Sequence, residues 1–331
     1  MNWLITGGCG FIGKNLIKRL INENDAHSIR IIDNLSVGQR EDLYYATNHY
    51  DEVTAAAASW EQGAVQLVVG DILDEKLAIS VSRGADVVVH LAANTGVAPS
   101  VENPRMDCVT NVLGTFNYLD ACRINEVKRF VFASSGAPIG ECTPPIHEEL
   151  APHPVSPYGA SKLAGEGYCS AFSRTFGLDT VALRFGNVYG PGSTHKSSVV
   201  AKFIRQAMEG ETLEIYGSGQ QTRDFIFMDD LLDAVCKAAN TPNIGGEIFQ
   251  IATNKETTVN HLVELMRPLF EAHGLHNVNI INSAPRLGDV LRNFSDTSKA
   301  KSMLGWEAKT SLEEGLRNTL MYFLSVHNHI S

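Results

Sequence analysis

The chain lacks the usual marks of a metalloprotein, a secreted protein or a membrane protein. Its six cysteines are scattered without a C-x-x-C pair, and its histidines show no metal-ligand spacing. No apolar run in the 331 residues reaches bilayer length, and glycines interrupt the N-terminal segment from Gly7 onward. We therefore expect free thiols, no metal and a cytoplasmic protein that spans no membrane.

Clustered positive charge is also scarce. The formal net charge is −10, and no basic run stands out along the chain. This balance argues against binding to nucleic acid or to an anionic membrane. An anionic ligand must therefore be held by individual arginines and by backbone amides, against the overall field of the protein.

What is present is an ordinary globular composition, 44% hydrophobic and 19% charged, in which short apolar runs alternate with amphipathic stretches. The runs are mostly continuous, which is typical of strands buried on both faces. The expected strands cover residues 3–5, 29–32, 65–69, 87–91, 130–133 and 180–185, and expected helices include 13–22, 106–124 and 157–176. This alternation predicts an α/β fold with a doubly wound parallel sheet, the Rossmann arrangement.

The regular alternation of expected strands and helices ends after residue 185. Residues 186–198 are rich in glycine, proline and serine. We predict a dinucleotide-binding domain over residues 1–185. A smaller mixed domain for the substrate is expected over residues 186–331, interleaved with elements from about 225–252 that return to the sheet. The segment 41–62 reads as an inserted helix or loop without a derivable role.

The first turn is rich in glycine. In "ITGGCGFIGKNLIKRLI", Gly7, Gly10 and Gly13 follow an expected strand and precede an amphipathic helix. Glycines in this context allow a tight turn and close approach to a pyrophosphate, whose charge the helix N-terminus then holds. The alternative is a glycine turn without a ligand, which the surrounding pattern makes the weaker interpretation.

Two aspartates follow the next strands. Asp33 lies at the end of the second strand, twenty residues after Gly13, where a carboxylate accepts from the adenosine ribose hydroxyls and repels a 2′-phosphate. Asp71 in "VVGDIL" lies at the third strand end, within expected reach of the adenine amino group. Together these residues predict NAD rather than NADP.

The segment "SPYGASKLAGEGY" places Tyr158 and Lys162 four residues apart, on one face of a helix that Ser156 can cap and Pro157 can begin. A phenol with a pKa of about 10 is a poor base at neutral pH. A nearby ammonium and a positive nicotinamide ring would favour the phenolate. Tyr158 could then exchange a proton with a substrate hydroxyl while hydride moves to or from the ring.

Several motifs together resemble an extended short-chain dehydrogenase/reductase. They are GGCGFIG, the strand-end DNL, the GD of "VVGDIL", "HLAA", "NVLGT" and "YGASK". Within that superfamily the chain is most similar to UDP-glucose (galactose) 4-epimerases and related nucleotide-sugar enzymes, over residues 1 to about 315. The resemblance implies cytoplasmic polysaccharide biosynthesis, a homodimer built on residues 106–124 and 157–176, and an enzyme that binds NAD and a UDP-sugar.

The resemblance also implies roles for matching positions. The implied catalytic residues are Ser135, Tyr158 and Lys162. The implied cofactor-binding residues are Gly7, Gly10, Phe11, Ile12, Gly13, Asp33, Asn34, Leu35, Asp71, Ile72, Leu91, Ala92, Ala93, Asn111, Tyr158, Lys162 and Phe185. The implied substrate-binding residues are Thr95, Ser135, Asn187, Arg223, Arg286 and Asn293. Two guanidiniums suit a diphosphate because each bonds bidentately and stays charged.

The reaction that the resemblance implies is 4-epimerisation of a UDP-hexose through a 4-keto intermediate. A medium-sized Asn293 is compatible with an N-acetylated or otherwise modified sugar. A 4,6-dehydratase or decarboxylase on the same scaffold is the main alternative. It is weakened because Gly136 and Ala137 stand where the similar dehydratases carry an acid and a base. A non-catalytic NAD-binding protein, or a net alcohol dehydrogenase, is a further alternative.

Overall fold

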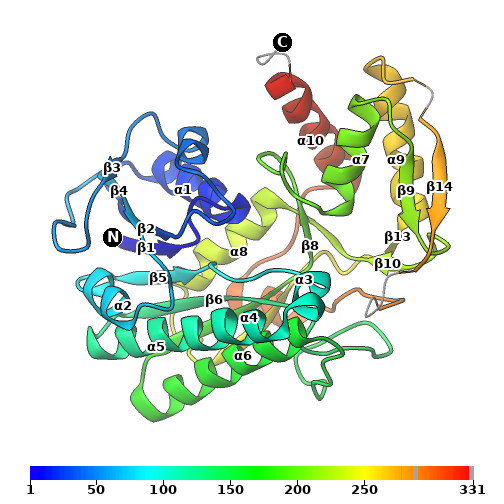
Figure 1. Cartoon of the computed structure of the whole chain (residues 1–331). Coiled ribbons are helices and arrows are strands. Elements are labelled where there is room, and N and C mark those ends of the chain that lie inside the picture. Colours follow the sequence, from blue (N-terminus) through cyan, green and yellow to red (C-terminus); the bar gives the residue numbers. More distant parts are fainter. Residues whose placement is uncertain (277, 286–289, 328–331) are drawn as a thin grey trace.

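An eight-stranded parallel sheet organises the chain (Figure 1). The computed structural model describes residues 1–276, 278–285 and 290–327. From one edge to the other the strand order is β12-β7-β6-β5-β1-β2-β4-β3. The strands are β1 (Asn2–Thr6), β2 (Ser28–Asp33), β3 (Asp51–Glu52), β4 (Val65–Val69), β5 (Val87–His90), β6 (Arg129–Ser135), β7 (Asp179–Phe185) and β12 (Glu247–Ile251). The doubly wound fold is confirmed, and the six expected strands are present with ends shifted by two residues at most.

Helices cover both faces of this sheet (Figure 1). One face carries α1 (Phe11–Glu23) and α8 (Met228–Asn240), whose apolar residues form one core cluster with the strands. The other face carries α2 (Glu75–Ser82), α5 (Gly114–Ile124) and α6 (Pro157–Phe176), which form a second cluster. The strands are therefore buried on both sides, which is why their sequences are continuous apolar runs.

The expected helix over residues 106–124 is interrupted. Its first part is α4 (Pro104–Cys108), whose preceding Asn103 accepts a hydrogen bond from the Met106 amide at 3.0 Å. A π-helical turn, η2 (Val109–Leu113), then leads into α5. Hydrophobic periodicity does not reveal such a turn, because its five residues are too few to show a period of their own. π-Helical turns are frequent at functional sites.

The segment 41–62 contributes to the edge of the sheet. It holds the 3-10 helix η1 (Arg40–Tyr45), in which Gln39 and Asp42 form a capping box. The short strand β3 then pairs in parallel with β4. The expectation of an inserted helix or loop therefore missed an edge strand, which is only two residues long.

Most of the remaining elements form a smaller lobe with its own apolar cluster (Figure 1). Its helices are α7 (Val199–Met208), α9 (Val259–Ala272) and α10 (Leu312–His327). Its short sheets pair β8 (Asn187–Tyr189) with β11 (Phe225–Phe227), β9 (Leu213–Tyr216) with β14 (Ile280–Ser283), and β10 (Thr222–Arg223) with β13 (Thr257–Thr258). The chain also contains α3 (Val97–Glu102) and the π-helical turn η3 (Ala300–Leu304). A domain division near residue 185 remains our proposal, with α8 and β12 packed in the first part.

Candidate active site

The glycine turn between β1 and α1 is closely packed. Gly7 has a φ of +71°, and a Cβ placed on it would lie 2.8 Å from the Ala92 amide nitrogen. A Cβ on Gly13 would collide with the carbonyl oxygen of Gly7. Gly10 directly precedes α1, and no side chain caps the first amides of this helix. The turn therefore has the backbone shape and the helix N-terminus that a dinucleotide pyrophosphate requires, with Phe11 and Ile12 as the first helical residues.

Asp33 ties this turn to the end of β2. One carboxylate oxygen accepts from the Cys9 amide and the other from the Leu35 amide, each at 2.9 Å. Burial raises the pKa of Asp33, and the two amide hydrogen bonds oppose this effect. Asp71 is linked to the same region, because its Oδ2 accepts from Asn34 Nδ2 at 2.9 Å. The two predicted aspartates and Asn34 thus lie at one end of the sheet.

The order of strands changes direction between β1 and β5, and nucleotides bind at such switch points in doubly wound sheets. Residues 91–93 continue from β5 directly beside the glycine turn. The Leu91 amide donates to the Thr6 carbonyl at 3.2 Å, and the Ala92 amide donates to Thr6 Oγ1 at 3.2 Å. The predicted residues from "GGCGFIG" and "HLAA" are therefore brought together, with Ile72 buried behind α5.

Ser135, Tyr158 and Lys162 meet where β6 ends and α6 begins. Ser156 caps α6 by accepting from the Gly159 amide at 3.1 Å, and Pro157 occupies its first turn as expected. A side-chain hydrogen bond links Ser135 to the Tyr158 phenol. The Lys162 ammonium lies 5.9 Å from the Tyr158 ring centre. The three predicted catalytic residues therefore form one cluster.

The environment of this cluster favours uncharged groups. Burial raises the pKa of Tyr158 to about 12, against the opposing effect of its hydrogen bond with Ser135. Burial also lowers the pKa of Lys162 to about 8, although the Asp107 and Glu166 carboxylates act in the other direction. Desolvation is the largest effect on both groups in the protein alone. That the ammonium and a bound nicotinamide favour the phenolate stays a prediction. Lys162 Nζ donates to the Ala133 carbonyl at 2.7 Å.

Asn111 lies in the π-helical turn and holds the loop after β5. Its Oδ1 accepts from the Asn94 amide at 2.7 Å, and its Nδ2 lies 2.9 Å from the Asn94 carbonyl oxygen. The side chain is buried and also contacts Asp107 and Ser161. In the structure Asn111 therefore shapes the loop that leads to Thr95, and its predicted contact with the cofactor stays a prediction.

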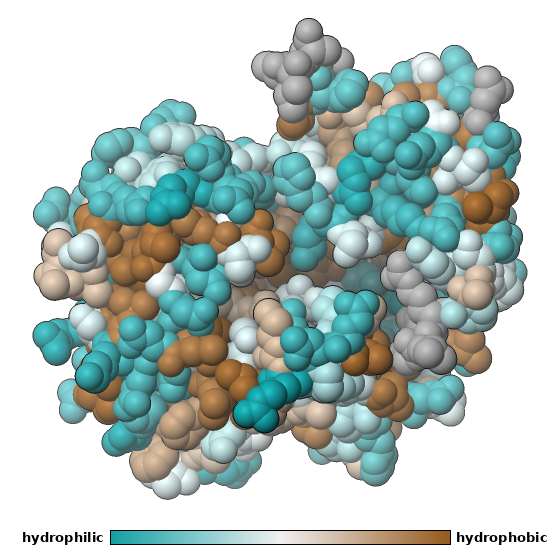
Figure 2. Space-filling model, viewed as in Figure 1, coloured by the Kyte–Doolittle hydropathy of each residue, from teal (hydrophilic) through white to brown (hydrophobic). Residues whose placement is uncertain are grey.

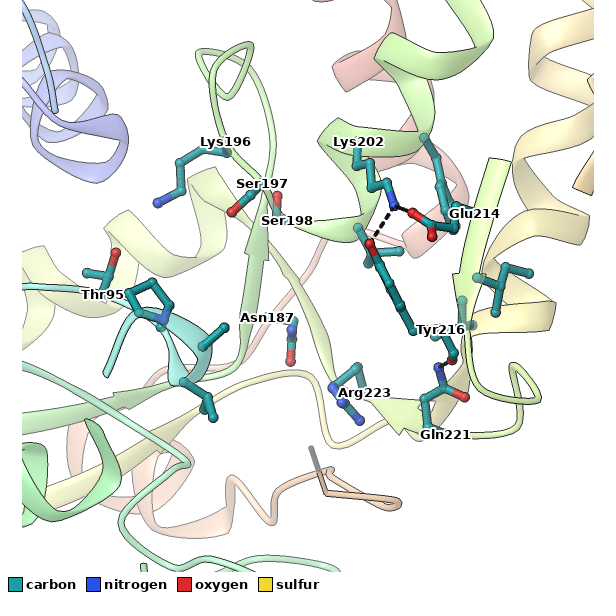
Figure 3. Close-up of a pocket in the computed structure, with 18 residues that line it drawn as sticks. Thr95, Asn187, Lys196, Ser197, Ser198, Lys202, Glu214, Tyr216, Gln221 and Arg223 are labelled. Carbon is teal, nitrogen blue, oxygen red and sulfur yellow. Dashed lines mark hydrogen bonds and ion pairs between the residues drawn. The ribbon is translucent and has the colours of Figure 1, made fainter. Parts of the chain in front are cut away.

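A pocket of about 450 Å³ separates the sheet from the smaller lobe, and Figure 2 shows the surface recessed there. Its volume lies in the range of small-molecule sites. The predicted residues Thr95, Asn187 and Arg223 all line it (Figure 3). Ser135 and Tyr158 are not among the lining residues, but Ser135 pairs in register with Phe185, two residues before Asn187. The catalytic cluster and the pocket therefore meet at neighbouring strand ends.

Two other predicted substrate residues have different outcomes. Asn293 lies near the catalytic strand end, because a Cβ placed on Gly136 would be 3.7 Å from Asn293 Nδ2. Arg286 falls outside the described residues.

Arg223 is held by the backbone, since its Nη1 donates to the Thr222 carbonyl at 2.6 Å and to the Val290 carbonyl at 2.9 Å. The neighbouring Asp224 is buried and accepts from Thr253 and Ser295, so Arg223–Asp224 is not a surface ion pair.

The sequence interpretation missed the polar side chains at the two ends of the pocket. Lys202 Nζ contacts the Glu214 carboxylate at 2.6 Å and the Tyr216 hydroxyl at 3.4 Å at one end (Figure 3). Lys196 lies at the Thr95 end, and burial lowers its pKa. No motif marked these residues, although Lys196 lies within the segment 186–198 that is rich in glycine, proline and serine.

The remaining expectations concern metals, thiols and membranes. All six cysteines lie in the described part of the chain as free thiols. Within the described ranges, no group of three His, Cys, Asp or Glu residues is placed to hold a metal ion. Among the same residues, no helix has both the length and the apolar character needed to cross a membrane.

Comparisons with known proteins agree with this site. Residues 3–252 match the family model described as "NAD dependent epimerase/dehydratase family". The UDP-glucose 4-epimerase of Mycolicibacterium smegmatis is 34% identical over 328 residues, which cover 98% of each chain.

Solved structures are similar over the whole length. A UDP-glucose 4-epimerase of Thermotoga maritima with UDP-glucose superposes with a TM-score of 0.87 at 35% identity, covering 99% of this chain and 100% of that one. A UDP-glucuronic acid 4-epimerase of Bacillus cereus, in complex with UDP-glucuronic acid and NAD, gives a TM-score of 0.86 at 28% identity, covering 98% and 100%.

Proposed function

Because the chain belongs to the NAD dependent epimerase/dehydratase family, we propose that it inverts C4 of a UDP-hexose through a 4-keto intermediate. The sugar is glucose or galactose, or an N-acetyl or uronic variant, since relatives named for such substrates are all similar to this chain. The observation that carries the proposal is the cluster of Ser135, Tyr158 and Lys162 beside a pocket that contains Asn187 and Arg223.

The glycine turn and its surroundings suit NAD. The residues that would hold it are the predicted set, with Gly7, Gly10 and Gly13 at the pyrophosphate, and Asp33 at the adenosine ribose. Asp33 keeps lone pairs for hydroxyl donors because each of its oxygens accepts only one amide. When bound, NAD supplies a hydride acceptor that later returns the hydride, and its positive ring favours an ionised phenol.

The chain's own residues then move one proton. Tyr158, as phenolate, takes the proton of the sugar 4-hydroxyl, which Ser135 holds by a hydrogen bond. Lys162 stabilises the phenolate through its positive charge. After the keto sugar has turned, Tyr158 gives the same proton back to the C4 oxygen on the other face. Substrate and product therefore have the same composition, and no net redox partner is consumed.

The sugar must turn while the rest of the substrate stays fixed. Arg223 and Asn187 are proposed to hold the diphosphate in the pocket, with Arg286 as a second guanidinium. Thr95 and Asn293 would contact the sugar. The backbone hydrogen bonds of Arg223 orient its guanidinium before any ligand arrives, which lowers the entropy cost of binding.

Proton NMR of the purified protein with a panel of UDP-sugars tests this function. We expect one gluco sugar to be converted to its 4-epimer with no free NADH accumulating. A product that has lost carbon dioxide or water would favour the decarboxylase or the 4,6-dehydratase instead. Accumulating NADH would indicate a net dehydrogenase. NAD-loaded protein that converts none of the UDP-sugars would contradict the proposal.

A further inference from the structure

We propose that Asp107 is a positioning residue whose buried carboxylate is the counter-charge of the Lys162 ammonium. This inference rests on the proposed function, because it concerns the same tyrosine and lysine. Asp107 belongs to no motif used above and lies on α4, which packs against α6.

Only one of the two Asp107 carboxylate oxygens has a hydrogen-bond partner among the described residues. Asp107 is 1% exposed, and its Oδ1 accepts from Asn111 Nδ2 at 2.9 Å. Its Oδ2 is buried and has no hydrogen-bond partner in the described part of the chain. The Ser161 hydroxyl, one residue before Lys162, accepts from the same Asn111 Nδ2 at 3.1 Å and lowers the pKa of Asp107. Asp107 is thus fixed against the turn of α6 that carries the catalytic pair.

Glu166 is the other buried carboxylate near Lys162, and its charge is already balanced. Its two oxygens accept from Arg184 Nε at 2.8 Å and from Arg184 Nη2 at 2.7 Å, and Ser134 adds a further hydrogen bond. Asp107 has no such guanidinium, since no ion pair joins it to any described residue. The Lys162 charge lowers the pKa of Asp107, and the Asp107 charge raises the pKa of Lys162.

Two further titratable groups near Lys162, His90 and Cys169, are uncharged. Burial lowers the pKa of His90 to about 3, so this imidazole is neutral between Thr6 and Thr115. Burial raises the pKa of the Cys169 thiol, which stays protonated. The charge state of the site is then set by Tyr158, Lys162 and Asp107. A negative Asp107 raises the pKa of both partners.

Asp107→Asn tests the proposal because it keeps the shape and removes the charge. In NAD-loaded protein with ¹³Cζ-labelled tyrosine, the Tyr158 resonance is assigned with Tyr158→Phe and titrated. We expect its pKa to fall by about one unit in Asp107→Asn, as for loss of a nearby charge. Both limbs of the pH profile for sugar epimerisation should move to lower pH by a similar amount. The control, Asp233→Asn, removes one charge from the surface of α8 and should leave both readouts unchanged.

A merely structural Asp107 would give a different result. The variant would then lose turnover at every pH, while the pKa of Tyr158 and the pH of both limbs of the activity profile stay unchanged. That result would overturn the proposal. The NMR titration needs no sugar, so it remains valid if the proposed epimerisation fails. If Asp107→Asn does not fold, ¹³Cγ NMR of the wild-type aspartates decides, because an Asp107 that is protonated at pH 7 also overturns the proposal.

Discussion

At the scale of single residues, burial moves the pKa values of the catalytic pair apart. The pKa of Lys162 falls from 10.5 to about 8, while that of Tyr158 rises from 10.0 to about 12. Both shifts have the same cause, because desolvation disfavours the charged form of each group. In the protein alone the Tyr158 phenol is therefore protonated at neutral pH, and added positive charge beside it would favour the phenolate.

Replacement of the phenol hydroxyl should abolish proton transfer without disturbing the fold. We expect Tyr158→Phe to reduce turnover by roughly 10³-fold, within the usual range for a general acid–base group. NAD content and thermal stability should stay near the wild-type values, since α6 keeps its cap at Ser156. Turnover measured by NMR, with NAD measured after denaturation, checks this. Retained activity would show that another group moves the proton.

The lowered pKa of Lys162 also makes a prediction about stability. Between pH 8 and 10.5 the unfolded chain binds more protons at this residue than the folded chain, so the wild type gains stability as the pH rises. Relative to Lys162→Met, the free energy of unfolding should increase by about 2 kcal/mol between pH 8 and 9.5. Urea unfolding at the two pH values measures the difference. A pH-independent difference would show that Lys162 does not change its pKa on folding.

At the scale of elements, the glycines of the β1–α1 turn and Gly167 of α6 have different roles. A Cβ on Gly13 would meet the backbone of Gly7 and Gly8, which cannot move without opening the turn. Gly167 lies in α6, and a Cβ placed there would find no atom within 4 Å. The same change, glycine to alanine, should therefore act in opposite directions at the two sites.

We expect Gly13→Ala to lose bound NAD and to unfold at a lower temperature. Gly167→Ala is the matched variant, and it should gain about 0.5–1 kcal/mol of stability because alanine is the better helix residue. Thermal unfolding and the NAD content of the purified variants test both. A Gly13→Ala variant that keeps NAD would show that the turn does not approach the cofactor closely.

At the scale of the whole molecule, one face carries several exposed apolar side chains. It is formed by α4, α5 and α6, on the sheet face opposite α1 (Figure 1). Met106 and Phe176 are each 54% exposed, and Phe116 packs against Tyr168 with ring centres 5.4 Å apart. Exposed apolar patches of this kind mark interaction surfaces. The expected homodimer would bury them against a second copy.

The double variant Phe116→Glu, Tyr168→Glu should therefore be monomeric, because the dimer would bury two pairs of carboxylates. Light scattering after gel filtration measures the mass. Met321→Glu on α10, an exposed apolar position outside this face, should leave the dimer intact. A wild-type protein with the mass of one chain would contradict the homodimer.

Local patterns predicted the fold well because its strands are buried on both faces, so their composition reports their position directly. The glycine turn, Asp33 and the Tyr158–Lys162 pair were found because each depends on short spacing within one strand or helix. The π-helical turn and β3 were missed. Both are too short, at five and two residues, to show a periodicity of their own.

The sequence alone determined the doubly wound sheet, the dinucleotide turn and the shared face of tyrosine and lysine. Only the tertiary structure decided that Asp107 lies against α6, that burial raises the pKa of the phenol, and that Lys196 and Lys202 line opposite ends of the pocket. The reason is physical. Periodicity and backbone conformation act between near neighbours in the chain, whereas desolvation and charge act between groups that only folding brings together.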